Sequence, residues 1–174
     1  MAPHDHEYFM RLALDQARVA YEKGEFPVGC VIRQKDRVVA SGSRMGTVSG
    51  NNRFSEIDHA EIRALRSLEL CDIGFEPDAA IVYSTMEPCL MCLGAILIAG
   101  IRHIVYAYED PMGGAACCDL GQLTPLYAKK EITIIPGIMR QESLDLFYNF
   151  FNKETNSYWK DSYLATYTLD QKKH

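Results

Sequence analysis

The sequence predicts a single α/β domain built on a mixed sheet that is covered by helices. The chain has 174 residues, which suits one domain with a sizeable core. Its hydrophobic content of 48% and charged content of 24% are ordinary for a globular protein. In the middle of the chain, apolar runs alternate as strand, helix, strand, helix, strand, a pattern typical of parallel strand pairs joined by crossover helices.

The first third of the chain predicts a helix, a hairpin and a loop. A helix capped by Asp5 runs to about residue 23, since apolar residues recur on one face and Gly24 follows as a stop. Two β-rich runs at 26–32 and 37–40 flank a short polar turn and form the hairpin. Residues 43–57 are rich in Gly, Ser and Asn, which indicates a loop.

The rest of the chain supplies the alternating elements. Asp58 can cap the second helix, and Pro88 begins the third, where its missing N–H costs nothing. In chain order we expect a helix at 58–70, a strand at 79–85, a helix at 88–99, strands at 102–108 and 131–135, and a helix at 141–151. Residues 152–174 form a C-terminal extension of the one domain (1–174), partly packed through its aromatic residues and disordered at its end.

Charge and apolar content exclude some classes of protein. The net charge of −5 gives no bulk attraction to phosphate, so nucleic-acid binding would need a local basic patch. The N-terminus has no signal-peptide pattern, and the longest apolar stretch, 89–101, is too short to cross a bilayer. We therefore expect a cytoplasmic protein. Six cysteines in such a chain do not indicate a disulfide framework.

Cys89 and Cys92 have the spacing of a metal pair. Three residues apart at a helix start, they can share a face, and the helix dipole with its free N–H groups stabilises thiolate there. A pair of core residues and a redox pair are the alternatives. His59 lies at another predicted helix start and would complete a three-ligand set. Structural zinc sites usually have four protein ligands, so three favour a catalytic zinc with one open position.

Glu61 has two interpretations. It can form a capping box with Asp58, or it can carry protons for a reaction at the metal. The presence of the three candidate ligands favours the second. Histidine-x-glutamate followed by proline-cysteine-x-x-cysteine is the signature of zinc-dependent base deaminases, and "HAE" at 59–61 with "PCLMC" at 88–92 fits it without a gap.

On these motifs the chain resembles the cytidine and deoxycytidylate deaminase superfamily, within it the branch of bacterial tRNA adenosine deaminases and guanine deaminases. The likeness extends through the segments at 25–32, 84–96, 103–110 and 131–151. It implies a three-layer αβα sandwich with a central mixed five-stranded sheet, and a homodimer formed by the helices around the site. It also implies one zinc ion per chain, held by His59, Cys89 and Cys92, with Glu61 as the proton shuttle of a hydrolysis that releases ammonia.

The resemblance also suggests pocket residues. Val28 and Cys30 belong to the strand that lines the base pocket in relatives, and Asp110 is kept after the fourth strand. Arg44 falls where relatives commonly carry an asparagine. Its fixed fork of donors would suit an acidic or carbonyl-rich substrate, whereas the alternative is a solvated loop arginine.

The departures from the family concern the substrate. The tRNA enzymes typically read arginine-aspartate-x-lysine where this chain has residues 109–112, "EDPM", and residues 109–120 contain three acidic residues and no basic one. A polynucleotide enzyme needs cations beside its phosphates. A small free nucleobase or nucleoside is therefore the favoured substrate, and tRNA adenosine-to-inosine deamination is the alternative.

Two hypotheses of other classes remain open. A non-catalytic zinc or scaffold domain would need a fourth protein ligand, for which Cys117 and Cys118 are the candidates. A thiol redox protein would use Cys89 and Cys92 but would leave His59 and Glu61 without a role.

Overall fold

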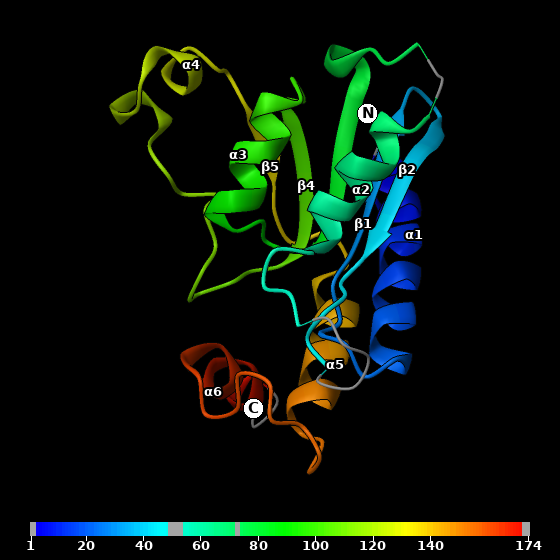
Figure 1. Ribbon diagram of the computed structural model, residues 1–174, viewed down its shortest axis with the longest axis vertical. Helices are drawn as coiled ribbons and strands as arrows, with labels where there is room; N and C mark the ends of the chain where they lie inside the picture. The colour runs from blue at the N-terminus through cyan, green and yellow to red at the C-terminus, as the bar shows by residue number, and fades with distance from the viewer. Residues whose placement is uncertain (1–2, 49–53, 72–73, 172–174) are drawn as a thin grey trace.

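The computed structural model describes residues 3–48, 54–71 and 74–171 and shows a five-stranded sheet between layers of helices (Figure 1). Its strands, in chain order, are β1 (Gly29–Gln34), β2 (Arg37–Ser43), β3 (Ala80–Met86), β4 (His103–Tyr108) and β5 (Thr133–Ile135). Its helices are α1 (Pro3–Glu22), α2 (Ala60–Glu69), α3 (Leu90–Ile98), α4 (Pro125–Ala128), α5 (Arg140–Phe151) and α6 (Tyr163–Asp170).

The sheet is mixed, as the alternation of elements predicts. The strand order is β2-β1-β3-β4-β5. Strand β1 pairs antiparallel with β2 and β3, whereas β3, β4 and β5 run parallel. Helix α3 makes the crossover from β3 to β4, which brings the carboxyl ends of these two strands to one edge of the sheet.

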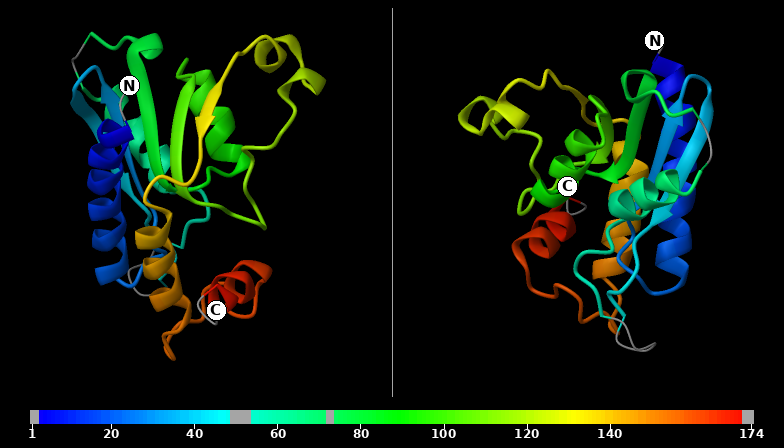
Figure 2. Two further views of the ribbon diagram at one scale, coloured as in Figure 1. Left: turned by 180° about the vertical axis from the view of Figure 1, so that it is seen from behind. Right: turned by 45° about the horizontal axis from the view of Figure 1, so that its top comes forward.

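The three layers follow from the two-residue period of the strands. On one face, Val31, Tyr83 and Val105 pack into a cluster with the apolar residues of α1. The neighbouring positions, such as Ile32 and Val82, point to the opposite face and pack with residues of α2 and α3. Figure 2 shows α1 and α5 together on the first face of the sheet, so the predicted αβα sandwich is confirmed.

Several predicted boundaries were wrong by one to three residues. The first strand begins at Gly29, and the preceding residues from Phe26 form an extended entry segment. The first helix begins at Pro3, which places Asp5 in its first turn instead of at its cap. The second and third helices begin at Ala60 and Leu90, two residues later than predicted, because the residues before them serve as caps.

The C-terminal extension folds back onto the domain. Helix α6 packs against α5, and the Tyr108 hydroxyl hydrogen-bonds to Thr168 Oγ1 at 3.0 Å. Arg140 donates to both carboxylate oxygens of Glu109, and the Tyr167 hydroxyl donates to the same carboxylate at 2.8 Å. The extension is therefore attached to β4 and to the start of α5 by buried and half-buried polar contacts.

Arg140→Gln removes the ion pair with Glu109, and we expect it to lower the free energy of unfolding by about 1 kcal/mol. The loss is no larger because the pair is partly exposed and therefore screened by solvent. Burial raises the pKa of Glu109, but the hydrogen bonds from Arg140 and Tyr167 outweigh it and hold that pKa below its usual range. The stability that the ion pair adds is fully present above the pKa of Glu109 in the unfolded chain, about 4.3. It is lost as the pH falls through the lower pKa of Glu109 in the folded protein. Melting curves at pH 7 should differ by about 2–4 °C between variant and wild type. The difference should shrink in acid, and equal melting at pH 7 would contradict the assignment.

In the described part of the chain, no helix combines the length and the apolar character needed to cross a membrane.

Candidate metal centre and active site

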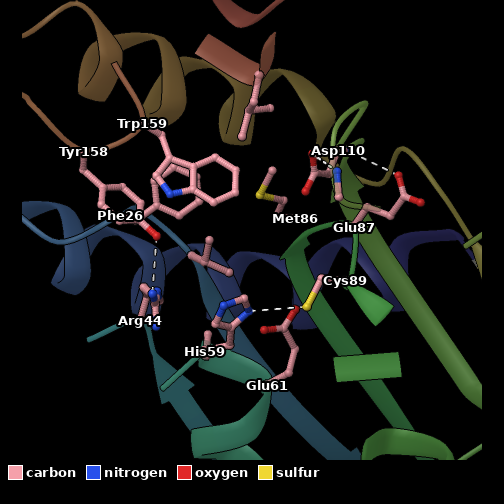
Figure 3. Close-up of a pocket in the computed structure, with 14 residues that line it drawn as sticks. Phe26, Arg44, His59, Glu61, Met86, Glu87, Cys89, Asp110, Tyr158 and Trp159 are labelled. Carbon is pink, nitrogen blue, oxygen red and sulfur yellow. Dashed lines mark hydrogen bonds between the residues drawn. The ribbon is translucent and has the colours of Figure 1, made fainter. Parts of the chain in front are cut away.

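The two signature motifs occupy the starts of two neighbouring helices. His59 is the N-cap of α2 and Cys89 is the N-cap of α3, both with extended backbone. Neither side chain makes a capping hydrogen bond. Both are therefore free to face the pocket beyond the carboxyl ends of β3 and β4, which is where open α/β sheets place their sites (Figure 3).

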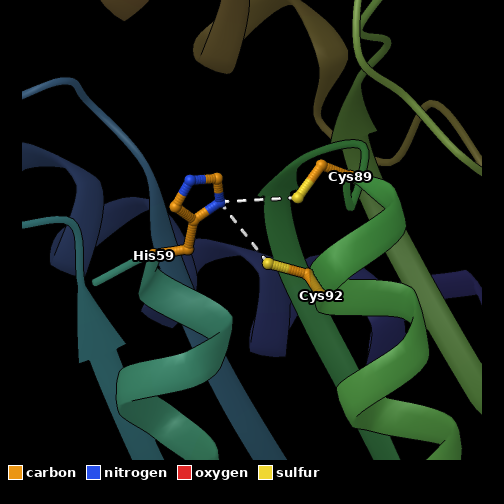
Figure 4. Close-up of side chains that lie close together, drawn as sticks. All are labelled: His59, Cys89 and Cys92. Atoms are coloured by element: carbon orange, nitrogen blue, oxygen red, sulfur yellow. Dashed lines mark hydrogen bonds between the residues drawn. The ribbon is translucent and has the colours of Figure 1, made fainter. Parts of the chain in front are cut away.

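The three predicted ligands lie together (Figure 4). His59 Nδ1 is 3.6 Å from Cys89 Sγ and 3.4 Å from Cys92 Sγ, and all three atoms lie within 4.8 Å of one another. In a tetrahedral site, Zn–S bonds of about 2.3 Å and Zn–N bonds of about 2.0 Å place nitrogen and sulfur about 3.5 Å apart. The observed separations fit this geometry, so the cluster suits zinc.

The protonation of the cluster also suits a metal. The hydrogen bond between Cys89 and Cys92 lowers the pKa of Cys89 and raises that of Cys92, which amounts to one proton shared by two thiols. Burial lowers the pKa of His59, but its hydrogen bond to Cys89 and the charge of Glu61 raise it above its ordinary value overall. A positive ion at this point would replace these protons and leave two thiolates and a neutral imidazole.

Glu61 lies beside the cluster and does not cap its helix. Glu61 is 3% exposed, with Oε2 3.6 Å from Cys92 Sγ, while Oε1 accepts a hydrogen bond from Ser84 Oγ at 2.9 Å. Asp58 instead pairs with Arg66 at 2.9 Å, so the capping-box interpretation was wrong. Burial raises the pKa of Glu61, which brings the carboxyl closer to the range of a group that takes up and releases a proton.

A small cavity opens above the cluster (Figure 3). Its volume is about 100 Å³, well below the 300–1,000 Å³ or so of pockets for drug-sized ligands. The wall contains Phe26, Val28, Arg44, His59, Ala60, Glu61, Met86, Glu87, Cys89, Asp110, Gly113, Tyr158, Trp159 and Leu164. Apolar and aromatic side chains surround a few polar groups, which is the composition of a site for one flat ring.

Three of the four suggested pocket residues lie in this wall. Val28 and Asp110 contribute to it, whereas Cys30 is fully buried in the core and outside it. Arg44 also lines the cavity, but it is only 2% exposed, so the interpretation as a solvated loop residue was wrong. Its guanidinium donates to Met45 O at 3.1 Å, to Glu56 at 3.4 Å and to the Tyr158 hydroxyl at 3.5 Å.

The loop after β4 closes the side of the site next to α3. Glu87 accepts hydrogen bonds from the backbone of Asp110 and Ala116, and Ala115 N donates to Pro88 O. Cys117 and Cys118 in this loop are exposed, and neither belongs to the metal-binding group found among the described residues. The fourth ligand required by the scaffold hypothesis is therefore not supplied by either of its candidates.

Gly42 on β2 sets the position of the α2 start. A Cβ there would lie 2.2 Å from Ala60 O and 2.7 Å from Ala64 N, which are backbone atoms of α2. We expect Gly42→Ala to displace the helix, to cost about 1–3 kcal/mol of stability and to weaken metal retention at His59. Urea unfolding and zinc retention during dialysis against a chelator measure both effects. Gly94→Ala is the control, since nothing lies within 4 Å of its added Cβ. Wild-type values for the Gly42 variant would contradict this account.

The sequence did not single out every residue around the site. Ser84 is fully buried in β3, and nothing in its local pattern distinguishes it from any other strand serine. Tyr158 and Trp159 were expected to pack down, but the sequence does not indicate where. The signal was the presence of aromatic and apolar residues, among them Tyr158, Trp159, Tyr163 and Leu164, in the extension.

Sequence comparisons agree with the geometry. The profile of the family described as the cytidine and deoxycytidylate deaminase zinc-binding region matches residues 3–108. A tRNA-specific adenosine deaminase of Agrobacterium fabrum is 35% identical over 153 residues, which cover 84% of this chain and 94% of the relative.

Solved structures have the same fold. One, from a study of A-to-I editing by tRNA:A34 deaminases at the wobble position of transfer RNA, is 34% identical with a TM-score of 0.65. It covers 80% of this chain and 98% of its own. The guanine deaminase of Bacillus subtilis is 33% identical with a TM-score of 0.51, over 60% of this chain and 64% of its own.

Proposed function

Because this chain belongs to the cytidine and deoxycytidylate deaminase family and is therefore a zinc-dependent hydrolytic deaminase, we propose that it removes an exocyclic amine from a nucleobase ring, with Glu61 as acid and base. The observation that carries the proposal is the buried Glu61 carboxyl beside the His59, Cys89 and Cys92 cluster.

In the proposed reaction, water adds to the ring carbon that bears the amine, and ammonia leaves. His59, Cys89 and Cys92 would hold the zinc ion, which would supply Lewis-acid activation of the attacking water. Glu61 takes one proton from the attacking water and passes it to the ring nitrogen beside that carbon, and it then moves the second water proton to the departing amine. A C–O bond forms as the C–N bond breaks, so the products are a ring carbonyl and ammonia. The Ser84 hydroxyl holds one carboxylate oxygen of Glu61 in place.

The relatives support an adenosine in tRNA as the substrate. The A. fabrum enzyme at 35% identity and the structure from the tRNA:A34 deaminase study are both named for action on tRNA. An enzyme that acts on a base within RNA extrudes that base into a small pocket, and a cavity of about 100 Å³ has the scale of one base.

A small free base or nucleoside is the second candidate, and features of this chain favour it. The C-terminal extension covers the cavity with Tyr158 and Trp159. Among the residues that the structure describes, Arg44 is the one arginine or lysine in the cavity wall, and it is buried and paired with Glu56. A polynucleotide needs accessible cations for its phosphates, and these residues provide none at the cavity.

Ammonia release from the purified, zinc-loaded protein tests the proposal. Adenine, guanine, cytosine, and their nucleosides and nucleotides form one set of substrates, and an anticodon stem-loop RNA forms the other. Turnover in either set supports deamination and identifies the substrate class. Ammonia release from none of them would reject the proposed function.

A homodimer also remains a proposal. Leu90 and Ile98 on the outer side of α3 are 63% and 66% exposed, and an apolar surface of this kind is typical of a subunit contact.

A further inference from the structure

The C-terminal extension contributes an aromatic roof to the cavity, formed by Tyr158 and Trp159. Figure 3 shows the indole of Trp159 between Tyr158 and Met86, above His59. Trp159 is 40% exposed although it lines the cavity, so part of the indole stays open to solvent. The Tyr158 ring packs against Trp159 at 5.8 Å and, tilted, against Phe26 at 5.5 Å, measured between ring centroids.

The backbone of this roof is held in a conformation that bulky residues rarely adopt. Trp159 has φ of 53° and Asp161 has φ of 63°, both in the left-handed region. Strain of this kind persists only where surrounding contacts impose it, and it is concentrated at functional sites. Here Asn156 clamps the backbone of Tyr158 on both sides, and Ser162 N donates to Trp159 O at 3.1 Å.

Arg44 connects the roof to the floor of the site. Its guanidinium reaches both Glu56 and the Tyr158 hydroxyl, and that hydroxyl donates to Glu56 at 2.9 Å. Because Arg44 is buried and directly follows β2, this partly buried network fixes the roof relative to the sheet. A guanidinium engaged in this way positions neighbouring side chains and is not free to bind a substrate carboxylate.

We propose that Trp159 is a specificity-determining residue that stacks on the substrate ring, and that Arg44 is the positioning residue that holds this roof in place through Tyr158. The inference rests on the proposed function and deepens it. The ligand it implies is a planar heteroaromatic base, since every such base offers a π-face to an indole. The roof is part of the same chain, so the stacking surface is present without a partner molecule.

Trp159 is the only tryptophan in the chain, so its fluorescence reports directly on stacking. In zinc-loaded protein carrying Glu61→Gln to prevent turnover, we expect titration with the deaminated base or nucleoside to give saturable quenching. In the otherwise wild-type enzyme, Trp159→Ala should raise KM about 10- to 100-fold with kcat changed only a few-fold. Trp159→Phe should recover most of the loss because it keeps an aromatic face.

The matched control is Tyr163→Ala, which removes an exposed aromatic residue of the same extension outside the cavity wall. It should leave KM unchanged. For Arg44→Gln, we expect a raised KM together with a red-shifted Trp159 emission as the roof loosens. Tyr158→Phe should also raise KM and shift the Trp159 emission to the red, but by less than Arg44→Gln, since it keeps the ring and removes only the hydroxyl.

An unchanged KM in Trp159→Ala, or an unchanged fluorescence at saturating substrate, would overturn the role of Trp159. If RNA is the only substrate that is turned over and Trp159→Ala does not slow its deamination, the role of Trp159 is likewise overturned. Ammonia release with an unaltered KM in Trp159→Ala would reject only this inference. Saturable quenching by a base without any ammonia release would reject only the proposed deamination.

Discussion

Replacing Glu61 with alanine should lower kcat by about 10²- to 10⁴-fold while the protein keeps its zinc and its fold, because it removes the group that transfers both protons. No other described carboxylate in the cavity wall is placed to take over the role. Glu87 accepts hydrogen bonds from the backbone of Asp110 and Ala116, and Asp110 accepts from the backbone of Met112 and Gly113. Ammonia release under saturating substrate measures the effect.

Glu61→Gln separates proton transfer from packing. Glutamine has the shape of the glutamate and can still accept the hydrogen bond from Ser84, but it cannot carry a proton between water and the leaving amine. It also removes a buried carboxyl whose pKa burial raises, so we expect stability to be unchanged or higher. A Gln variant with kcat within tenfold of the wild type would rule Glu61 out as the acid and base.

How far the site could be predicted depends on whether its residues lie in local patterns. His59, Glu61, Cys89 and Cys92 lie in two short segments, each at a helix start marked by its own sequence. The two motifs and their spacing were therefore enough to predict the ligand set. The structure adds that the N-cap position leaves the side chains of His59 and Cys89 free of their helices.

The remaining residues depend on contacts far apart in the sequence. Arg44 looks like a loop residue until Glu56 and Tyr158 are seen to surround it, and Tyr158 lies more than one hundred positions away. The contact of Ser84 with Glu61 follows from the packing of α2 against the sheet, which no local pattern in β3 encodes. Composition predicted that the extension packs down, but the roof itself results from backbone geometry at Trp159 that its sequence does not indicate.

The zinc ligands carry the second large effect. Cys92→Ser should reduce zinc from one per chain to a small fraction and abolish ammonia release, because two ligands hold the ion far less tightly than three. Zinc that binds only the folded state stabilises it by linkage, by about 4 kcal/mol when free zinc exceeds its Kd a thousandfold. The variant should therefore unfold at lower urea concentration than the wild type, and added chelator should bring the wild type to the same midpoint. Elemental analysis and urea curves measure both quantities.

Cys118→Ser is the matched control, because Cys118 is an exposed thiol outside the cluster. It should keep both the zinc and the wild-type urea midpoint. Cobalt in place of zinc gives a further readout. Sulfur-to-cobalt absorption bands report on thiolate ligands, so they should weaken in Cys92→Ser and stay unchanged in Cys118→Ser. If instead Cys118→Ser lost its zinc as Cys92→Ser does, four protein ligands would hold the ion and the site would be closed by the loop after β4. The open position that hydrolysis requires would then be missing, and the scaffold hypothesis would replace the deaminase.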